Sequence, residues 1–409
     1  MIPLEQALAI VNRAAGAPRA RRERVSLAAA LGRVLADDVS IDHDVPAFDR
    51  STMDGFALRA ADVATAGAVL PVVARVLAGA SPPSALAAGT AVAIMTGAPI
   101  PSGADAVVPV EVTEPADGAR GAERTVRFLA PASAGANLSR RAEQVRGGDV
   151  VLRAGARVRP ATIGVLATTG TTEVSVAARP SVSIVATGDE IVAAASRPGP
   201  TQVRDSNGHV LAAQVARAGG APRYDGPVPD ERGALEAAIR EGLKADVLCV
   251  TGGVSMGERD LVPGVLEALG VERLFHRWAV KPGGPLWFGR RGETLVFGLP
   301  GNPAAAFVGF ELLVVPALAT RQGIAFAPRR TFRAVFDGTT GRPIARRQVV
   351  PVRVEHRGPV AHAVPVRWTG SGDVFGLAAG DAFAFVPERT RIDAPRTREV
   401  DVLPLGDGA

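Results

Sequence analysis

The sequence predicts a multidomain chain of α/β and β structure, built around a doubly wound, mainly parallel α/β domain. Short apolar runs alternate with helix-length segments over residues 181–326, which is typical of strand–helix–strand units. Short β-type runs separated by turns fill residues 69–135 and the segment from 329 to the end. The length of 409 residues favours roughly two to four domains over a single core.

Composition narrows the class of protein. Hydrophobic residues make up 47% of the chain and aromatic residues 4%, so the cores consist mostly of Ala, Val and Leu. The net charge is +5 without long like-charge runs, which disfavours nucleic acid binding. Cys249 is the only cysteine, and this excludes an intrachain disulfide and fits a reducing cytosol.

No membrane or secretory segment is expected, so the predicted location is cytoplasmic. The N-terminus has helical periodicity and an acidic Glu5, and it lacks the basic region of a signal peptide. Apolar runs fall short of the ~20 residues of a membrane span. The C-terminal apolar run over 312–319 is interrupted by Pro316.

The first third of the chain is expected to contain two helices, a long loop and a small β domain. Residues 3–15 show helical spacing, and Ser26 can cap a second helix that ends near Leu35. Residues 42–62 have no sustained period and are dense in Asp, which predicts a long functional loop. The β-type runs of 69–135 follow.

The later elements follow in order. A polar segment over 137–149 precedes a helix at 160–169, which we expect to rejoin the N-terminal helices. Strands are predicted at 182–187, near 223, and at 246–250, 271–280, 285–289 and 294–298. Helices are predicted at 207–218, 231–243 and 263–269, with a last one from about 302. The final β segment predicts a small barrel.

Residues 245–260 form the strongest candidate site. The apolar strand 246–250 runs into Thr251-Gly252-Gly253 and then into Ser255, Gly257, Glu258 and Asp260. Open α/β sheets build sites in this way, at the carboxyl ends of their strands. Right-handed crossovers would bring the strand ends after Thr187, Val250 and Gly298 to the same edge.

Four glycine-rich turns support this site. They are TGDE (187–190), TGGVSMGERD (251–260), KPGGP (281–285) and LPGNP (299–303). Glycines let backbone N–H groups approach an anion closely, and Lys281 adds a positive charge. Each turn alone is an ordinary tight turn, but four on one sheet favour an oxyanion or phosphate site.

Carboxylates lie near the same strand ends. They include Asp189, Glu190, Asp230 and Asp260, while Asp44, Asp49 and Asp54 lie in the long loop. Carboxylates beside a phosphate site commonly hold Mg²⁺ or orient a water molecule. Taken alone, Asp44 and Glu258 read as solvated acids, whereas the setting of Asp54, Glu190 and Asp260 favours function.

The sequence lacks the signature motifs of several common enzyme classes. The sequence has no P-loop, no dinucleotide-binding G-x-G-x-x-G after a strand and no G-x-S-x-G elbow. The five histidines show no metal-binding spacing, and nothing supports a serine triad.

Seven motifs together resemble the molybdenum-insertase family, the MoeA family of molybdopterin molybdenumtransferases that includes the gephyrin E domain. In the family's order they are FDRSTMDGFALR (48–59), IMTGAPIPSGADAVVPVE (94–111), TGDE (187–190), DSNG (205–208), TGGVSMGERD (251–260), VKPGGPLWFG (280–289) and LPGNPAA (299–305). The resemblance covers nearly the whole chain.

The resemblance implies a domain plan and an assembly. A helical base comprises 1–42 and 138–178, with an inserted β-rich domain at 43–137. A molybdopterin-binding α/β domain at 179–326 and a C-terminal β-barrel at 327–409 follow. Family members form homodimers, with a cleft between the α/β domain of one subunit and the inserted domain of the other.

The implied reaction is a Mg²⁺-dependent transfer. Molybdate is inserted into adenylylated molybdopterin, and AMP and molybdenum cofactor are released. Molybdopterin adenylyltransferase, apo-molybdoenzymes and chaperones are the expected protein partners. The phosphoanhydride and dithiolene of the substrate call for an anion cradle and a metal, which are the features that the sequence predicts.

The resemblance also assigns roles to single residues. The catalytic candidates are Asp54, Thr96, Gln144, Glu190, Asp230 and Asp260, of which Glu190 and Asp260 would also position Mg²⁺. The substrate-binding candidates are Arg140, Thr187, Gly188, Asp189, Ser206, Asn207, Gly252, Gly253, Ser255, Gly257, Lys281, Pro300, Gly301, Asn302, Pro303 and Ser371. Molybdate is expected near the Pro300–Pro303 loop.

Two positions depart from the family pattern. Gln144 stands where an aspartate is expected, and an amide neither acts as a base nor binds Mg²⁺ strongly. Gly284 replaces a second lysine in the KPGGP turn. These departures leave open a low-activity or inactive paralogue that carries molybdopterin or acts as a scaffold. A tungstate-specific insertase is a further alternative, and an unrelated nucleotide hydrolase is disfavoured by the matching outer segments.

Overall fold

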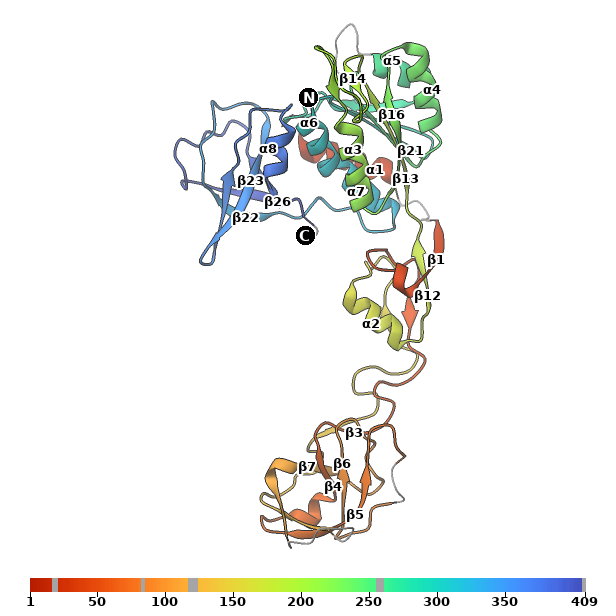
Figure 1. Cartoon of the computed structure of the whole chain (residues 1–409), viewed down its shortest axis with the longest axis vertical. Coiled ribbons are helices and arrows are strands. Elements are labelled where there is room, and N and C mark those ends of the chain that lie inside the picture. The colour runs from red at the N-terminus through yellow and green to blue at the C-terminus, as the bar shows by residue number, and fades with distance from the viewer. Residues whose placement is uncertain (17–20, 82–84, 117–123, 255–260, 407–409) are drawn as a thin grey trace. The chain divides into compact units, whose positions relative to one another are not determined.

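The computed structural model describes residues 1–16, 21–81, 85–116, 124–254 and 261–406, and the chain forms two compact units. The first unit comprises 1–37, 154–158 and 174–409, and the second comprises 38–153 and 159–173. Each unit has its own hydrophobic cores, and Figure 1 shows the elements of both.

A six-stranded sheet forms the centre of the first unit, as the sequence predicts. Its order is β16 (Ala221–Val228), β13 (Ser181–Thr187), β17 (Val247–Thr251), β21 (Thr294–Leu299), β20 (Trp287–Arg291) and β18 (Glu272–His276). The first four strands run parallel to one another, β20 runs antiparallel to β21, and β18 runs antiparallel to β20. The strand bodies are apolar, so the sheet can be covered on both faces.

Helices cover both faces of this sheet (Figure 1). One face packs against α4 (Arg232–Gly242) and α5 (Leu261–Ala268). The other packs against α1 (Leu4–Ala15), α3 (Asn207–Arg217), α6 (Pro303–Gly309), the π-helical segment Phe310–Val314 and α7 (Val315–Arg321). This arrangement confirms the predicted doubly wound domain.

The helical run Pro303–Arg321 is longer than the sequence suggested. It is continuous over 19 residues with a mean hydropathy of 1.7, enough in length and composition for a membrane span, but 78% of it is buried in the protein. Pro316 does not break it, because the π-helical turn just before this residue accommodates the missing N–H. The run is therefore a core helix of the α/β domain.

The helix expected from Ser26 to Leu35 is absent. Arg22–Ser26 instead forms β1, which pairs with β12 (Glu173–Ala177), and only a short 3₁₀ turn follows at Leu27–Ala29. Leu35 also bridges to Val176. Pairing with distant segments outweighs the local capping signal here.

Residues 1–42 and 138–178 contribute to both compact units. Helix α1 packs into the core of the α/β domain through Leu4, Ala7 and Val11. Helix α2 (Pro160–Thr168) forms where predicted and belongs to the second unit. The segments before and after the second unit are joined by the β1–β12 pair.

The C-terminal segment closes into the predicted barrel. Its five strands are β22 (Phe332–Phe336), β23 (Arg347–Arg357), β24 (Val360–Pro365), β25 (Ala382–Val386) and β26 (Glu399–Pro404). They pair in the closed order β23–β24–β22–β26–β25–β23. The short strand β19 (Val280–Lys281) adds to β23 and ties a loop of the α/β domain to the barrel.

The second unit holds a six-stranded sheet. Its order is β7 (Ala106–Pro109), β4 (Gly55–Leu58), β6 (Ala91–Ile94), β5 (Val69–Val76), β9 (Arg124–Phe128) and β8 (Thr113–Pro115). Two smaller pairs join β2 (Val39–Ser40) to β11 (Val150–Leu152) and β3 (Arg50–Ser51) to β10 (Leu138–Ser139). The prediction of a loop over 42–62 is therefore wrong in part, because β3 and β4 lie within this range. Strand β4 is fully buried, and its four residues are too few to show a period.

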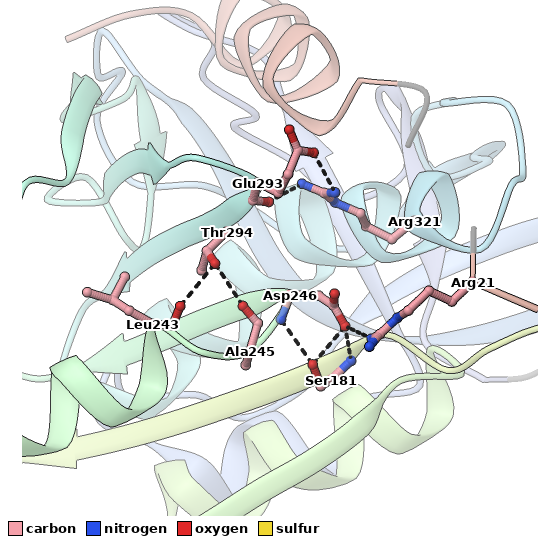
Figure 2. Close-up of polar contacts among 8 residues, drawn as sticks. All are labelled: Arg21, Ser181, Leu243, Ala245, Asp246, Glu293, Thr294 and Arg321. Carbon is pink, nitrogen blue, oxygen red and sulfur yellow. Dashed lines mark hydrogen bonds and ion pairs between the residues drawn. The ribbon is translucent and has the colours of Figure 1, made fainter. Parts of the chain in front are cut away.

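Polar groups at the amino ends of the central strands are paired with one another (Figure 2). The Asp246 carboxylate accepts hydrogen bonds at 2.7 Å from the backbone and hydroxyl of Ser181 and from Arg21. The Thr294 hydroxyl lies 2.9 Å from the carbonyl of Ala245. These contacts fasten the strand starts and leave the opposite edge of the sheet for a binding site.

Candidate functional site

The carboxyl ends of three parallel strands meet as predicted. Ala186 pairs with Thr251, and Thr251 pairs with Leu299, so the three following turns lie side by side. A cavity of about 990 Å³ lies over these ends. The predicted residues that line it are Thr187, Gly188, Glu190, Ser206, Asn207, Asp230, Gly252, Gly253, Pro300, Gly301, Asn302 and Pro303.

Hydrogen bonds between the turns shape the floor of this cavity. The Thr251 hydroxyl donates to the carbonyl of Pro300 at 3.0 Å. The Asn207 amide lies 3.0 Å from that hydroxyl and donates to the carbonyl of Gly301 at 2.7 Å. Thr251 and Asn207 therefore hold two turns together, and Asn207 has a structural role besides its predicted contact with substrate.

Gly252 permits the close approach of two turns. Its φ is +95°, and a Cβ at this position would stand 2.1 Å from the carbonyl oxygen of Thr187. No side chain fits in that space. The glycine predicted from the sequence as an anion-binding residue is thus also required for packing.

Carboxylates cluster at the β13 end of the cavity. Asp230 accepts a hydrogen bond from the Thr187 hydroxyl at 2.5 Å, and its backbone N–H donates to Asp189 at 3.1 Å. Asp189 supports this turn, whereas Asp230 and Glu190 line the cavity. Among the described residues, the Glu190 carboxylate has no hydrogen-bond or ion-pair partner, so its oxygens are available to a ligand.

These oxygens suit a hard cation. Mg²⁺ is bound in proteins by one or two carboxylates, with substrate phosphates and water completing its octahedron. No cluster of three or more His, Cys, Asp or Glu side chains that could hold a metal occurs within the described residues. Glu190 fits the predicted role, while Ser255, Gly257 and Asp260 lie outside the described residues.

A second cavity of about 460 Å³ adjoins the first and shares Pro285, Pro300 and Asn302 with it. Lys281 and Ser371, two of the predicted substrate-binding residues, line it. The Asn302 amide donates to the Ser371 hydroxyl at 3.0 Å, which links the α/β domain to the barrel. Among the described residues no Asp or Glu lines this cavity.

Sequence reasoning missed three residues of this second cavity. Arg346, Gln348 and Trp368 line it from the barrel side. Arginine is the chain's dominant base, and none of these residues lies in a glycine-rich motif. The pairing of β19 with β23 brings Arg346 and Gln348 to the Lys281 turn, and a two-residue strand gives no readable signal.

The remaining predicted residues belong to the second unit. The backbone N–H and the hydroxyl of Thr96 both donate to Asp54 at 2.7 Å, and these bonds hold the pKa of the Asp54 carboxyl below its usual range. Arg140 pairs with Asp49 at 2.7 Å. The pairing of β3 with β10 places these two segments together.

Gln144 lies at the end of an irregular turn. Its backbone N–H donates to the carbonyl of Val45, and its exposed side chain has no hydrogen-bond partner among the described residues. Two residues earlier, Ala142 adopts a positive φ of 59°, a region that favours glycine. Thr96 and Asp54 are thus joined by hydrogen bonds, whereas the Gln144 side chain has no hydrogen-bond partner among the described residues.

Three protein-family models match successive parts of this chain. Residues 2–170 match the "MoeA N-terminal region (domain I and II)". Residues 183–320 match the "Probable molybdopterin binding domain", and 338–405 match the "MoeA C-terminal region (domain IV)".

Individual relatives are similar to this chain over nearly its full length. "Molybdopterin molybdenumtransferase" of Bacillus subtilis (strain 168) is 37% identical over 95% of this chain and 91% of the relative. The protein of the same name from Staphylococcus aureus (strain Mu50) is 33% identical over 95% of this chain and 92% of the relative. A solved "molybdopterin biosynthesis moea protein" from Pyrococcus horikosii has a TM-score of 0.80 and 32% identity, with 99% of each chain covered.

Proposed function

The chain belongs to the MoeA family of molybdopterin molybdenumtransferases, and from this premise we propose that it inserts molybdate into adenylylated molybdopterin and releases AMP. Members of this family are transferases of molybdenum cofactor biosynthesis. One observation carries the proposal for this chain. A carboxylate-lined cavity at the strand ends adjoins a smaller cavity lined by cations.

The larger cavity suits the phosphoanhydride of the substrate. Glycine turns line it, and Glu190 with Asp260 would hold Mg²⁺. When bound, the metal supplies charge neutralisation at the phosphates. Asp230 and the Thr187 hydroxyl hydrogen bond to each other in the cavity wall, so they can orient a substrate oxygen beside it.

The smaller cavity suits molybdate. Lys281 contributes a positive charge, and Ser371 and Asn302 contribute hydrogen-bonding groups. Because the two cavities share Pro300 and Asn302, an oxyanion in one lies next to a pterin phosphate in the other. This proximity supports coupling of molybdate insertion to phosphoanhydride cleavage.

The proposal extends to residues of the second unit and to the assembly of the protein. Asp54, Thr96, Arg140 and Gln144 contribute to turnover, with Asp54 kept ionised by Thr96. The protein acts as a cytoplasmic homodimer that receives its substrate from molybdopterin adenylyltransferase and passes the cofactor to apo-molybdoenzymes or chaperones. The fully buried Cys249 thiol is consistent with a cytosolic enzyme.

A reconstituted assay tests the proposal. Purified protein is supplied with adenylylated molybdopterin, Mg²⁺ and molybdate, and AMP and molybdenum cofactor are measured. AMP at the level of an enzyme-free control would contradict it. Competition between molybdate and tungstate identifies the preferred oxyanion.

The second candidate function is a carrier or scaffold without turnover, which the free amide of Gln144 favours. If the protein is such a carrier, Gln144→Asp should raise AMP release sharply. A wild type that is already active and is unchanged by this substitution contradicts the carrier.

A further inference from the structure

We propose that Phe375 is a stacking platform for a flat heteroaromatic ring of the substrate at the rim of the larger cavity. The inference rests on the proposed function and deepens it, because adenylylated molybdopterin carries two such rings, the adenine and the aminopyrimidinone of the pterin. Phe375 lies outside the motifs that predicted the site, and it comes from the C-terminal part of the chain rather than from the α/β sheet.

Phe375 combines high exposure with a place at the site. It exposes 85% of its surface, more than any other large apolar residue among those described. A single exposed apolar residue is ordinary in itself. Phe375, however, lines the larger cavity, and so does Val203, which is 52% exposed. Two exposed apolar residues from distant parts of the chain therefore border one site.

The larger cavity has an apolar lining as well as a charged one. Ile191 of β14 (Ile191–Val192), Val203 of β15 (Val203–Arg204) and Val374 line it together with Phe375. The carboxylates of the cavity suit a metal ion and phosphates, whereas a heteroaromatic ring is held by apolar and aromatic side chains. The apolar lining thus provides for the part of the substrate that the charged groups do not bind.

A network of hydrogen bonds fixes the backbone that carries Phe375. The short helix α8 (Val374–Ala379) lies beside α6 (Figure 1). The Asp373 carboxylate precedes this helix and accepts a hydrogen bond at 2.8 Å from the backbone N–H of Gly376. It also accepts hydrogen bonds from the backbone N–H of Thr369 at 2.9 Å and from its hydroxyl at 3.0 Å.

The inner side of α8 is packed, which sets Phe375 apart. Leu377 is buried in the core, and a Cβ on Gly376 would stand 2.8 Å from the carbonyl oxygen of Arg367. Phe375 is thus an exposed ring on a fixed backbone and makes little contribution to packing. Such a ring loses only the freedom of two side-chain torsions when it binds a ligand, so the entropic cost of binding is small.

Stacking accounts for a ring at this position. Bases stack on aromatic side chains, and replacing the aromatic residue by alanine typically weakens binding by about fivefold to 100-fold. Every heteroaromatic ring has a face that can stack, so the adenine and the pterin are both candidates. AMP and 6-hydroxymethylpterin are the probes that distinguish these two sources.

Binding of the two ring probes to the full-length protein with Mg²⁺ tests the inference. AMP is titrated by calorimetry, and 6-hydroxymethylpterin is followed by its own fluorescence. The probe whose ring stacks on Phe375 should bind Phe375→Ala at least about fivefold more weakly. Phe375→Tyr keeps the flat ring and should stay within about twofold of wild type. Phe375→Leu keeps apolar surface without the ring and should lose most of the effect.

A ligand control and a variant control accompany these titrations. Ribose 5-phosphate has the sugar and phosphate of AMP without the base, so Phe375→Ala should leave its affinity unchanged. Val360→Ala removes an exposed apolar side chain from β24, at a position that lines neither cavity. This variant should bind both ring probes as wild type does. The thermal midpoint of each Phe375 variant should stay within about 2 °C of wild type, because the side chain is exposed.

Several results would overturn the inference. These are an unchanged affinity of both ring probes in Phe375→Ala, wild-type affinity in Phe375→Leu, and a loss of ribose 5-phosphate affinity as large as that of the ring probe. Absence of binding of either ring probe to wild type at millimolar concentration would do the same. A loss confined to AMP supports stacking of the adenine, and a loss confined to 6-hydroxymethylpterin supports stacking of the pterin.

AMP release on the same proteins separates this inference from the proposed function. Phe375→Ala should raise the KM for adenylylated molybdopterin and leave kcat within about threefold, because stacking holds the bound substrate and the transition state equally. Ring binding that depends on Phe375, without AMP release in wild type, would refute the proposed function alone. AMP release with the same KM in wild type and Phe375→Ala would refute the inference alone.

Discussion

The Asp54–Thr96 pair is the best-defined contact between predicted site residues in the second unit. Two hydrogen bonds from Thr96 lower the pKa of the Asp54 carboxyl, the larger effect coming from the hydroxyl. The carboxylate therefore contributes stability above its unfolded pKa of about 4, and this contribution is lost as pH falls through the lowered folded value.

Thr96→Val should raise the pKa of Asp54 part of the way to its ordinary value, because the backbone N–H of residue 96 remains as a donor. Carboxyl chemical shifts followed by NMR during an acid titration measure this change. Thr113→Val is the matched control, since its hydroxyl donates to the Val110 carbonyl and touches no carboxylate. An unshifted Asp54 titration in Thr96→Val contradicts the assigned hydrogen bond.

Ala142 has a backbone conformation that alanine adopts at a cost. Its φ of 59° is left-handed, where a Cβ is unfavourable by about 1–2 kcal/mol. Ala142→Gly should therefore raise the free energy of unfolding by up to about 1 kcal/mol after the greater backbone entropy of glycine is deducted. Denaturant unfolding measures this.

The same substitution in a helix provides the control for Ala142. Ala14→Gly in α1 should lower stability by about 1 kcal/mol. If Ala142→Gly destabilises the protein as Ala14→Gly does, the left-handed turn is not the native conformation.

Single residues were predictable where a motif fixed them to a strand end. Glu190, Asp230 and Gly252 lie together because parallel strands end at one edge, which the sequence reveals through its alternating elements. Arg346 and Trp368 could not be predicted, since their position depends on how the barrel packs against the α/β domain, and the strand pair between these two parts includes only two residues of β19. Such tertiary contacts leave no local pattern.

The turn after β17 is the element on which the larger cavity depends. Gly252→Ala would place a methyl group 2.1 Å from the Thr187 carbonyl oxygen, so the turn must shift. We expect a loss of about 2 kcal/mol or more in stability and weaker substrate binding. Thermal unfolding and AMP release measure the two effects.

Gly264→Ala is the matched control for the turn. Gly264 lies in α5, and a Cβ there meets nothing within 4 Å. This change should stabilise the helix by up to about 1 kcal/mol and leave AMP release unchanged. A tolerated Gly252→Ala, equal to Gly264→Ala in both readouts, would contradict the packing of the two turns.

The π-helical segment Phe310–Val314 positions a buried carboxylate. Glu311 has no exposed surface and pairs with Arg217 of α3 and with Arg329, while Gln214 donates to it at 2.7 Å. Arg217 and Arg329 also donate to the backbone carbonyls of Leu405 and Pro404. The cluster fastens the α/β domain to the end of the barrel.

Glu311→Ala should destabilise the protein by about 3 kcal/mol, because it leaves two arginines without their carboxylate. For a unit of this size, the thermal midpoint should fall by about 6–12 °C. Glu236→Ala breaks an exposed pair with Arg240 and should change the midpoint by about 1–2 °C at most. Similar shifts in both variants would contradict the structural role of Glu311.

Elements with a long apolar or helical pattern were predicted well, and short ones were not. The strands of the α/β sheet and the helices α1 to α4 lie close to their expected positions. The prediction of a helix over 26–35 was wrong because Ser26, its expected cap, ends strand β1, which pairs with β12 near the end of the second unit's sequence. Strand β4 was missed because four buried residues carry no periodicity.

At the scale of the whole molecule, charge is divided between two adjoining cavities. Among the described residues, three carboxylates, those of Glu190, Asp205 and Asp230, line the larger one beside a single cation, Arg204, and Lys281 and Arg346 line the smaller one. The division places a cation-assisted phosphate site beside a site for a free oxyanion. Molybdate should therefore bind without pterin, and Mg²⁺ should be required for AMP release and not for molybdate binding.

The proposed homodimer is also a property of the whole molecule. Sedimentation velocity of the purified protein should give the mass of two chains of 42.0 kDa. A monomer that catalyses full turnover at micromolar concentration would refute the dimer while leaving the reaction intact.

The most direct measurement of the central claim is a single-turnover assay of AMP release. Enzyme loaded with adenylylated molybdopterin and Mg²⁺ is mixed with molybdate, and AMP and molybdenum cofactor are counted. The proposed coupling of the two cavities predicts little AMP before molybdate is added, followed by about one AMP per cofactor formed. AMP release at the same rate without molybdate, or cofactor formation without AMP, would contradict it.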